Sequence, residues 1–309
     1  MVATVQYKIL FSGLGSIGQK HLENLISKLK ERKIEFQIDA LRTSNKPFDG
    51  ITNTYTSYTE VSDDYDIIFI TNPTSVHYET IELLKHKTKN MFIEKPIFDK
   101  IQNCEFSSGI NYIACPLRFH PIIKELKKFV QNNQVFAFRA ICSSYLPSWR
   151  KTKNYQDCYS AKKDMGGGVT LDLIHEIDYL TWIFGTPNEI KTIKAKFSNL
   201  EITSDDVAQY IFEFTNTLGS LHLDYFGQYS NKAKREIEVF SENDTLLFDV
   251  INNQIKSLKT NTVSEFSKED IYLNEMDYFL DLIQHGAKEH YNMPSEALDN
   301  LKIALGENQ

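Results

Sequence analysis

A glycine-rich turn between an apolar run and a helical pattern constrains the fold of this chain more than any other feature. Residues 7–12 (YKILFS) form an apolar run of strand length, and Gly13-Leu14-Gly15-Ser16-Ile17-Gly18 follows directly. Apolar residues then recur at helical spacing, at Ile17, Leu22, Leu25, Ile26 and Leu29. This order predicts a strand, a tight turn and a helix.

Each glycine of such a turn has its own expected role. Gly13 permits the turn, Gly15 lets the backbone approach a pyrophosphate, and Gly18 allows the helix to pack closely on the strand. The helix N-terminus, at Ser16 and Ile17, then faces the anion. We therefore expect a nucleotide-binding unit, the alternative being an ordinary glycine-rich turn.

The end of the next strand bears on which nucleotide binds. The strand expected over Glu35–Leu41 ends at Arg42-Thr43-Ser44, where an NAD-binding protein often places an acid for the ribose hydroxyls. Arg42 with the hydroxyls of Thr43 and Ser44 suits a 2′-phosphate instead and favours NADP over NAD. Asp39 has the expected offset from the glycines but lies in mid-strand. If Arg42 is only a solvated residue, the preference stays open.

Two further apolar runs, 66–71 (DIIFIT) and 90–94 (NMFIE), are typical of strands buried in a parallel sheet. We expect the turns that follow them to lie beside the cofactor. The residues concerned are Thr71, Asn72, Pro73, His77, Glu94, Lys95 and Pro96. For His77, at the start of a helix, the alternative is a residue that only packs or caps.

A second motif lies in the middle of the chain. A triple glycine, 166–168, precedes a helical pattern expected to run continuously from Val169 to Phe184. Asp172 and His175 are three residues apart, so on such a helix they emerge on one face. Two polar groups would thereby be presented to one cleft.

A histidine and a lysine in this setting favour proton and hydride chemistry. Oxidation of an alcohol by hydride transfer requires loss of the hydroxyl proton, and histidine, with a pKa of about 6.5, is suited to take it. A lysine ammonium stabilises the charge that develops on the oxygen. His175 and Lys95 are therefore candidate catalytic groups, although a lone histidine is more often structural. Glu176 and Asp178 are expected to face solvent or to cap the helix.

Taken together, these segments resemble a known family. GLGSIGQKH, TNPTSVH and EKP, followed by GGGVTLDLIHEIDYLTWIFG, look like the glucose-fructose oxidoreductase and inositol dehydrogenase family (Gfo/Idh/MocA). The resemblance implies that Lys95 reaches into the active site and that the Lys95–Pro96 bond is cis. It also implies that His175 is the acid/base and that Asp172 orients substrate or nicotinamide. Many relatives separate the acid and the histidine by one residue more than this chain does.

The expected fold class is α/β: an N-terminal Rossmann domain with a mainly parallel sheet, over 1–118, and a C-terminal α+β domain with a large, mostly antiparallel open-faced sheet, over 119–309. Ala208, Tyr210 and Phe212 should form one face of that sheet. The strand-like runs of this domain are 135–145, 190–197, 207–214, 220–226, 236–240, 246–250 and 254–258. Helices at Asn274–His285 and after Ser295 are expected to complete the second domain. The resemblance implies a homodimer or homotetramer assembled through the sheet.

Aromatic and polar residues before the triple glycine suggest a substrate-binding surface. Ring faces of Trp149 and Tyr159 can contact the C–H surfaces of a sugar, and Arg150 suits a phosphate or carboxylate. The alternative is a surface loop with incidental aromatics. Arg118 is a candidate ligand of an anionic substrate or, equally, a salt-bridge partner. The candidate substrate-binding residues are Lys95, Arg118, Trp149, Arg150, Tyr159, Asp172 and His175.

Composition argues against several classes of protein. A net charge of −7 disfavours sequence-independent binding to nucleic acid. Four scattered cysteines without a C-x-x-C pair indicate neither a disulfide framework nor a metal site, and with no signal peptide the expected compartment is the cytoplasm. No apolar run reaches the ~18 residues that a membrane span needs, so no membrane partner is expected.

The sequence therefore predicts an NAD(P)-dependent oxidoreductase that acts on a secondary alcohol or ketone of a sugar, cyclitol or sugar nucleotide. The reaction centre is expected where the two domains meet. One alternative is a redox-neutral NAD-dependent glycosidase. Another is a nucleotide-sensing binding protein without catalysis, against which the presence of both Lys95 and His175 argues.

Overall fold

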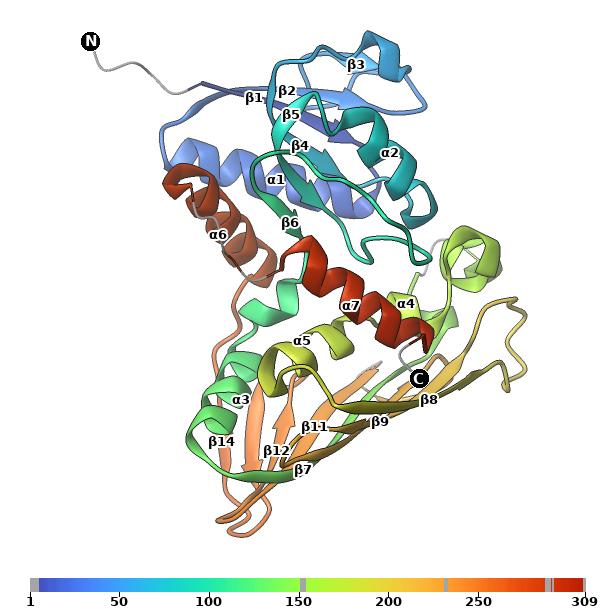
Figure 1. Ribbon diagram of the computed structural model, residues 1–309, viewed down its shortest axis with the longest axis vertical. Helices are drawn as coiled ribbons and strands as arrows, with labels where there is room; N and C mark the ends of the chain where they lie inside the picture. Colours follow the sequence, from blue (N-terminus) through green and yellow to red (C-terminus); the bar gives the residue numbers. More distant parts are fainter. Residues whose placement is uncertain (1–5, 151–153, 231–232, 287–289, 291, 308–309) are drawn as a thin grey trace. The chain divides into compact units, whose positions relative to one another are not determined.

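The computed structural model describes residues 6–150, 154–230, 233–286, 290 and 292–307 (Figure 1). The chain divides into two compact units, each built on one sheet. The first comprises Met1–Pro116 and Asp270–Leu298, and the second comprises Leu117–Glu269 and Asp299–Gln309. Within the described ranges, no helix is both long and apolar enough to cross a membrane.

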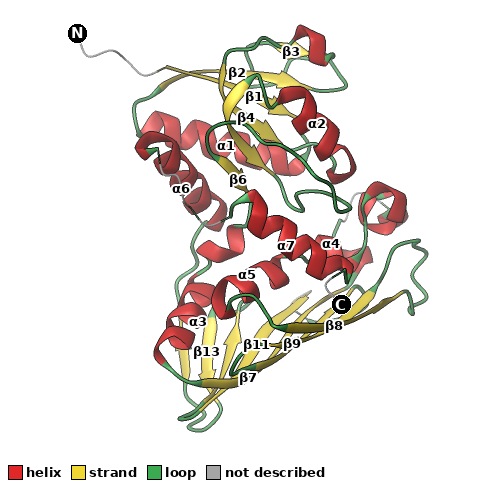
Figure 2. Cartoon of the chain, viewed as in Figure 1, coloured by secondary structure: helices red, strands yellow, loops and turns green. Residues whose placement is uncertain are grey.

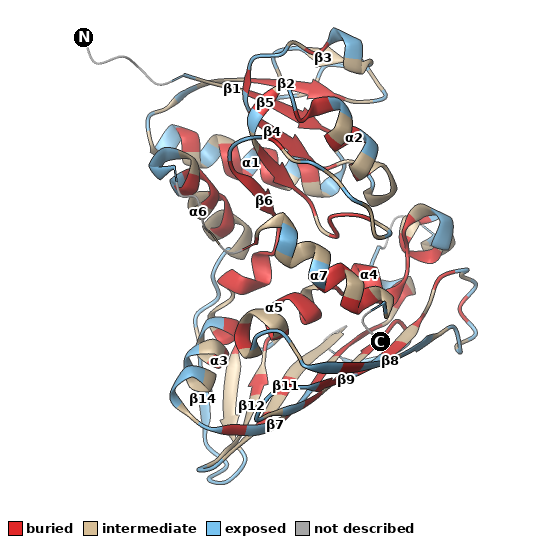
Figure 3. Ribbon diagram, in the orientation of Figure 1, coloured by how far each residue is buried: buried red, intermediate tan, exposed pale blue. Residues whose placement is uncertain are grey.

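The first unit contains a six-stranded sheet in which all neighbouring strands are parallel. Its strands are β1 (Gln6–Ser12), β2 (Glu35–Leu41), β3 (Thr54–Tyr55), β4 (Tyr65–Ile70), β5 (Thr88–Ile93) and β6 (Asn111–Ile113). The order β3-β2-β1-β4-β5-β6 is that of a doubly wound dinucleotide-binding sheet. In Figure 3 the inner strands β1, β4 and β5 are buried over most of their length. The predicted Rossmann domain is thus confirmed.

Two helices far apart in the sequence, α1 (Ser16–Glu31) and α6 (Ile271–His285), lie side by side in the first unit, while α2 (His77–Leu84) packs on β4 (Figure 1). The Phe279 ring of α6 lies 5.8 Å from that of Phe69 and 5.1 Å from that of Phe92. The expectation that the helix near 274–285 completes the second domain is therefore wrong. Periodicity identifies the apolar side of a helix but not the sheet that it covers.

The second unit contains an eight-stranded sheet in the order β14-β13-β12-β11-β7-β10-β9-β8 (Figure 2). Its strands are β7 (Val135–Ser144), β8 (Glu189–Ala195), β9 (Val207–Glu213), β10 (Leu218–Asp224), β11 (Ala233–Ser241), β12 (Thr245–Asp249), β13 (Gln254–Ser257) and β14 (Val263–Glu265). Only the pair β10–β7 is parallel; the other neighbours are antiparallel. The prediction of a large, mostly antiparallel sheet is confirmed, although β14 was not foreseen.

The two faces of this sheet differ in burial. Ala208, Tyr210 and Phe212 point to a buried face, as predicted, and the helices α3 (Pro121–Asn132), α4 (Val169–Asp172) and α5 (His175–Phe184) lie over it (Figure 1). The Tyr210 hydroxyl donates to the Ala304 carbonyl of the last helix, α7 (Pro294–Leu305), at 3.0 Å. We name the opposite side, which carries Ile193, Ile211 and Leu218, the outer sheet face. No described helix covers it, and these three side chains are exposed.

Candidate active site

The predicted cofactor residues of the first unit all follow the carboxyl ends of parallel strands. Gly13 comes directly after β1, Arg42 after β2, Thr71 after β4 and Glu94 after β5. Because the carboxyl ends of parallel strands share one edge, these segments lie along the same edge of the sheet. The chain winds in opposite directions from β1 and from β4, and a crevice at this point of a doubly wound sheet is the usual ligand site.

Close packing of the turns after β1 and β4 explains two of the glycines. Gly13 has φ +96°, and a Cβ atom there would lie 2.7 Å from the Asn72 backbone. A Cβ at Gly18 would lie 2.8 Å from both the Gly13 carbonyl and Thr71 Oγ1. The Thr71 hydroxyl donates to that same carbonyl at 2.7 Å. A side chain at either position would push the two turns apart.

Gly15 has a different environment, because a Cβ there would meet no atom within 4 Å. The helix α1 begins at the next residue, with no side-chain cap at its N-terminus and no acidic residue in its first turn. The backbone N–H groups of that turn therefore have no intrahelical acceptor. Open space next to uncapped N–H groups fits the pyrophosphate of a dinucleotide.

The acid near the end of β2, Asp39, forms hydrogen bonds within the protein. Asp39 is fully buried and accepts hydrogen bonds from the Tyr65 hydroxyl at 2.8 Å and from the backbone N–H of Asn53 at 3.1 Å. Arg42, by contrast, lies just past the strand with its guanidinium 5.5 Å from the Phe48 ring centre. Its Nη1 atom has no hydrogen-bond partner among the described residues. This strand end thus presents a cation and no carboxylate.

His77 joins the turns after β4 and β5. The side chain is 1% exposed, with Nε2 2.9 Å from the Asn72 carbonyl and Nδ1 3.1 Å from the Pro96 carbonyl. Burial lowers its pKa, although the nearby carbonyls act in the opposite direction. This geometry matches the packing alternative for His77, and direct contact with a cofactor stays a prediction.

A buried pair that the sequence did not reveal supports the backbone of Lys95. His21 Nε2 on α1 lies 2.5 Å from Glu94 Oε1, and the Lys95 N–H donates to Glu94 Oε2 at 3.0 Å. Burial alone would raise the pKa of Glu94, but the hydrogen bond and charge of His21 hold it below its usual value. The Lys95–Pro96 bond is cis, as the resemblance implied. A single histidine in a helical pattern gives no sequence signal for such a role.

In the second unit the triple glycine allows a carboxylate to cap α4. Gly168 has φ +134°, and a Cβ there would collide with the Asp205 carboxylate. That carboxylate accepts a hydrogen bond from the Thr170 N–H at 3.0 Å, while the Asp205 carbonyl accepts one from Val169 at 3.0 Å. Asp205, which sequence reasoning missed, thus fixes the start of the helix that carries Asp172.

The expectation of one continuous helix over 169–184 is wrong. The segment forms α4 and α5, separated by a turn at Leu173 and Ile174. There the Ile174 N–H donates to Leu171 at 3.4 Å and the Glu176 N–H to Leu173 at 3.2 Å, so bonds across three residues replace the usual four. Neither glycine nor proline marks the break. Asp172 ends one helix and His175 begins the next, so a helical wheel does not give their directions.

Two tyrosines surround the carboxylate of Asp172, which is buried. The Tyr225 hydroxyl donates to Asp172 Oδ2 at 2.5 Å. The Asp172 charge, followed by burial, raises the pKa of Tyr159 well above its usual range. Both phenols therefore stay protonated and can donate to the carboxylate. Tyr225 was not predicted, because it sits at the end of an ordinary strand pattern.

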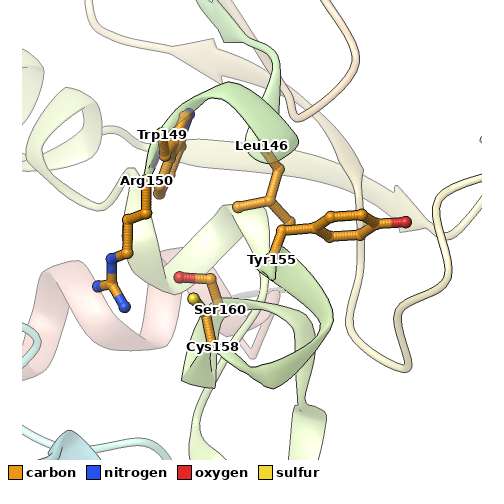
Figure 4. Close-up of a pocket in the computed structure, with 6 residues that line it drawn as sticks. All are labelled: Leu146, Trp149, Arg150, Tyr155, Cys158 and Ser160. Atoms are coloured by element: carbon orange, nitrogen blue, oxygen red, sulfur yellow. The ribbon is translucent and has the colours of Figure 1, made fainter. Parts of the chain in front are cut away.

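The predicted substrate-binding aromatics join this cluster. The Trp149 ring stands edge-on to Tyr225 at 5.3 Å, and its Nε1–H donates to Ser144 Oγ at 2.9 Å. The Arg150 guanidinium lies 5.7 Å from the Tyr159 ring centre. A small pocket opens here (Figure 4), lined by Leu146, Trp149, Arg150, Tyr155, Cys158 and Ser160. Trp149 and Arg150 of this loop thus pack against the two tyrosines that surround Asp172 of α4.

The acids that follow His175 do not face solvent, contrary to expectation. Glu176 is 0% exposed and Asp178 4% exposed. Arg235 Nε lies 2.5 Å from Glu176 Oε1, and Arg118 contacts both carboxylate oxygens of Asp178 at 2.9 and 2.6 Å. Buried carboxylates require such partners, and helical periodicity does not reveal them. Arg118 is 3% exposed, so of its two predicted roles the salt bridge is the one found here.

Comparison with known proteins identifies the family. Residues 7–106 match the family described as oxidoreductase family, NAD-binding Rossmann fold, and residues 123–247 match the GFO/IDH/MocA C-terminal domain. The chain belongs to the Gfo/Idh/MocA oxidoreductase family. The resemblance inferred from the motifs is confirmed, and this Gfo/Idh/MocA protein is an NAD(P)-dependent dehydrogenase.

Three relatives illustrate the similarity. The Gfo/Idh/MocA chain is 25% identical to the uncharacterized oxidoreductase YrbE of Bacillus subtilis, over 96% of this chain and 86% of YrbE. A levoglucosan dehydrogenase solved with NADH and levoglucosan superposes with a TM-score of 0.77 at 13% identity, covering 97% of this chain and 95% of that one. The UDP-N-acetylglucosamine 3-dehydrogenase GnnA of Acidithiobacillus ferrooxidans gives 0.75 at 16% identity, covering 98% and 96%. At these identities the solved structures establish the fold alone.

Proposed function

We propose that this dehydrogenase transfers a hydride between NADP(H) and a secondary alcohol or ketone of a sugar, cyclitol or sugar nucleotide. The observation that carries the proposal is the cluster around Asp172, in which two phenols approach a buried carboxylate three residues before His175 and the Trp149 indole packs edge-on against one of these phenols. Rings that contact C–H surfaces, beside a few polar groups, suit a carbohydrate. The sugar and nucleotide sugar in the names of two structural neighbours support the same class.

The first unit holds the dinucleotide in this proposal. The uncapped N–H groups after Gly15 bind the pyrophosphate, and Arg42 with Thr43 and Ser44 binds a 2′-phosphate. We infer a preference for NADP because the only acid within β2 near this end, Asp39, is fully buried and hydrogen bonded to Tyr65. The turns at 71–73 and 94–96 complete the cofactor site. The bound nicotinamide accepts or supplies the hydride.

Proton transfer is assigned to His175. The Asp172 carboxylate already accepts a hydrogen bond from Tyr225 at 2.5 Å, which fixes the position of that carboxylate. We therefore assign Asp172 to orienting a substrate hydroxyl and His175 to taking or returning the hydroxyl proton. Lys95, with its backbone held by Glu94, stabilises the charge on the reacting oxygen.

A substrate screen with matched variants tests these roles. NADPH and NADP⁺ absorbance is followed with levoglucosan, inositol and UDP-N-acetylglucosamine, and the substrate found is then given to His175→Asn and Lys95→Met proteins. Loss of general acid/base catalysis lowers turnover by about 10²–10⁴-fold. NADPH binding should persist in His175→Asn. Near-normal turnover in either variant would sink the assignment.

The same absorbance assay distinguishes the proposed dehydrogenase from the glycosidase alternative. A redox-neutral glycosidase would release the aglycone from a chromogenic glycoside with no net change in NADPH. Net oxidation or reduction of the nicotinamide in step with substrate conversion excludes that alternative.

We further propose that the cofactor role belongs to residues 1–118 and the substrate and assembly roles to residues 119–309, apart from α6, which packs on the first unit. The outer sheet face supports assembly as a homodimer or homotetramer. It carries Ile193 at 70% exposure, Leu218 at 55% and Ile211 at 44%, on neighbouring strands. Apolar side chains gathered on an exposed sheet face are typical of a subunit interface.

A further inference from the structure

Two ion pairs, each with a buried carboxylate, hold the first turn of α5, the helix that begins at His175. Glu176 pairs with Arg235 of β11, with 2.5 Å between Nε and Oε1. Two residues on, Asp178 pairs with Arg118 of the short helix Pro116–Phe119, at 2.9 Å to Oδ2 and 2.6 Å to Oδ1. The two arginines come from different elements, so the turn is held from two directions.

This turn lacks the usual means of fixing a helix start. Its N-cap residue, Ile174, makes no side-chain hydrogen bond, and the N–H groups of Ile174 and Glu176 bond across three residues instead of four. An uncapped helix start frays more readily than a capped one. The two arginines therefore supply the constraint that a capping side chain would normally provide.

The chemistry of the pairs favours positioning over stability. A buried ion pair loses much hydration energy and adds little net stability, but the planar guanidinium imposes a fixed geometry on the carboxylate. Arg118 shows that geometry, since Nε and Nη2 reach different oxygens of Asp178. Asn300 adds a third contact to the same carboxylate, at 3.1 Å.

We propose that Arg118 and Arg235 are positioning residues that fix the orientation of His175 through Asp178 and Glu176. The proposal rests on the function proposed above for His175. Neither arginine touches the reacting atoms. Each acts by setting the direction of the first turn of α5, and hence of the imidazole at its first residue.

Arginine-to-lysine variants test the proposal, because lysine keeps the charge but not the fork of donors. Arg118→Lys and Arg235→Lys are compared with Arg32→Lys, whose guanidinium lies 2.7 Å from Asp277 in the first unit. The readouts are the NMR signal of the His175 ring in protein with ¹³C-labelled histidine, assigned by its absence from His175→Asn, and turnover of the screened substrate. The His175 signal should move in both test variants and not in the control. We expect kcat to fall at least tenfold while KM for NADPH is unchanged.

Results that contradict this proposal can be told apart from results that contradict the proposed function. If the His175 signal and kcat match the wild type while the melting temperature falls, the pairs are only structural and the proposal is wrong. If a lysine variant does not fold, Glu176→Gln and Asp178→Asn, which keep one hydrogen-bond acceptor each, give the same two readouts. If His175→Asn retains turnover, the proposed function fails, whereas the NMR signal still decides whether the arginines orient the ring.

Discussion

Substitution of Gly15 by alanine should separate cofactor binding from folding. Gly15 has φ −71° and ψ −171°, an extended conformation that alanine also adopts, and an added Cβ meets no protein atom within 4 Å. Alanine at a helix N-cap costs about 0.5–1 kcal/mol relative to glycine. Alanine also lowers the conformational entropy of the unfolded chain, which stabilises the folded state by about 0.4–1 kcal/mol. The free energy of unfolding should therefore change by less than about 0.5 kcal/mol.

Dinucleotide binding should change much more, because the new methyl group occupies the space assigned to the pyrophosphate. Excess volume of this size in a packed site typically costs about 1–3 kcal/mol. At 1.4 kcal/mol for each factor of ten, the Kd for NADPH should rise about 5- to 150-fold. Fluorescence titration with NADPH measures this change, and urea unfolding followed by circular dichroism measures the stability.

Gly13→Ala is the matched control. Its left-handed backbone costs about 1–2 kcal/mol for alanine, and the Cβ would lie 2.7 Å from the Asn72 backbone. With about 1–3 kcal/mol for the overlap, less about 0.4–1 kcal/mol of entropy gain, this variant should lose about 1–5 kcal/mol of stability. If Gly15→Ala binds NADPH as the wild type does, the pyrophosphate does not lie against this turn and the reasoning is refuted.

Four further predictions concern single residues. Arg42→Gln should weaken NADPH binding about 10- to 100-fold and leave NADH binding unchanged, because one charge-assisted contact is lost; comparable losses for both would contradict a 2′-phosphate site. Tyr225→Phe should lower kcat/KM about 10- to 100-fold without affecting the Kd for NADPH, since Asp172 loses its 2.5 Å hydrogen bond. Burial, with the nearby Arg235 charge, lowers the pKa of His120 in the folded protein from 6.5 to about 4. Between these two pH values the unfolded chain binds the proton and the folded protein does not, so the free energy of unfolding falls as the pH drops from about 6.5 to about 4. His120→Asn, which can still cap α3, should flatten the plot of urea unfolding midpoint against pH over this range. An unchanged slope would exclude His120 as the source of the pH dependence. Ile211→Lys should convert the assembly to monomers in light scattering, and an unchanged mass would exclude the outer sheet face as the interface.

Features encoded locally could be predicted from the sequence. The turn from β1 into α1 follows from the glycine spacing, and the structure gives Gly13, Gly15 and Gly18 environments that suit the expected roles. Strand alternation likewise identified the buried face of β9. In both cases the sequence signal is the spacing of residues along the chain, although the contacts that explain Gly13 and Gly18 come from Asn72 and Thr71, which are remote in the sequence.

Features that depend on distant contacts escaped sequence reasoning. The break between α4 and α5 has no glycine or proline to mark it. The burial of Glu176 depends on Arg235, which is remote in the sequence. Tyr225 reaches Asp172 only because the sheet brings them together, and His21 reaches Glu94 in the same way. Such pairs have no period and no fixed spacing, so a single sequence does not reveal them.

The packing of α6 on the first unit also determines when that unit can fold during synthesis. Its core combines Phe69 and Phe92 with Met276, Phe279 and Leu280 of α6, so the core stays incomplete until residues near 285 have left the ribosome. At about 5–20 residues per second, this delay after residue 118 is roughly 10–30 s. Throughout that interval the aromatic surface of the sheet is open to water and to chaperones. A fragment that ends at residue 118 would keep it open permanently.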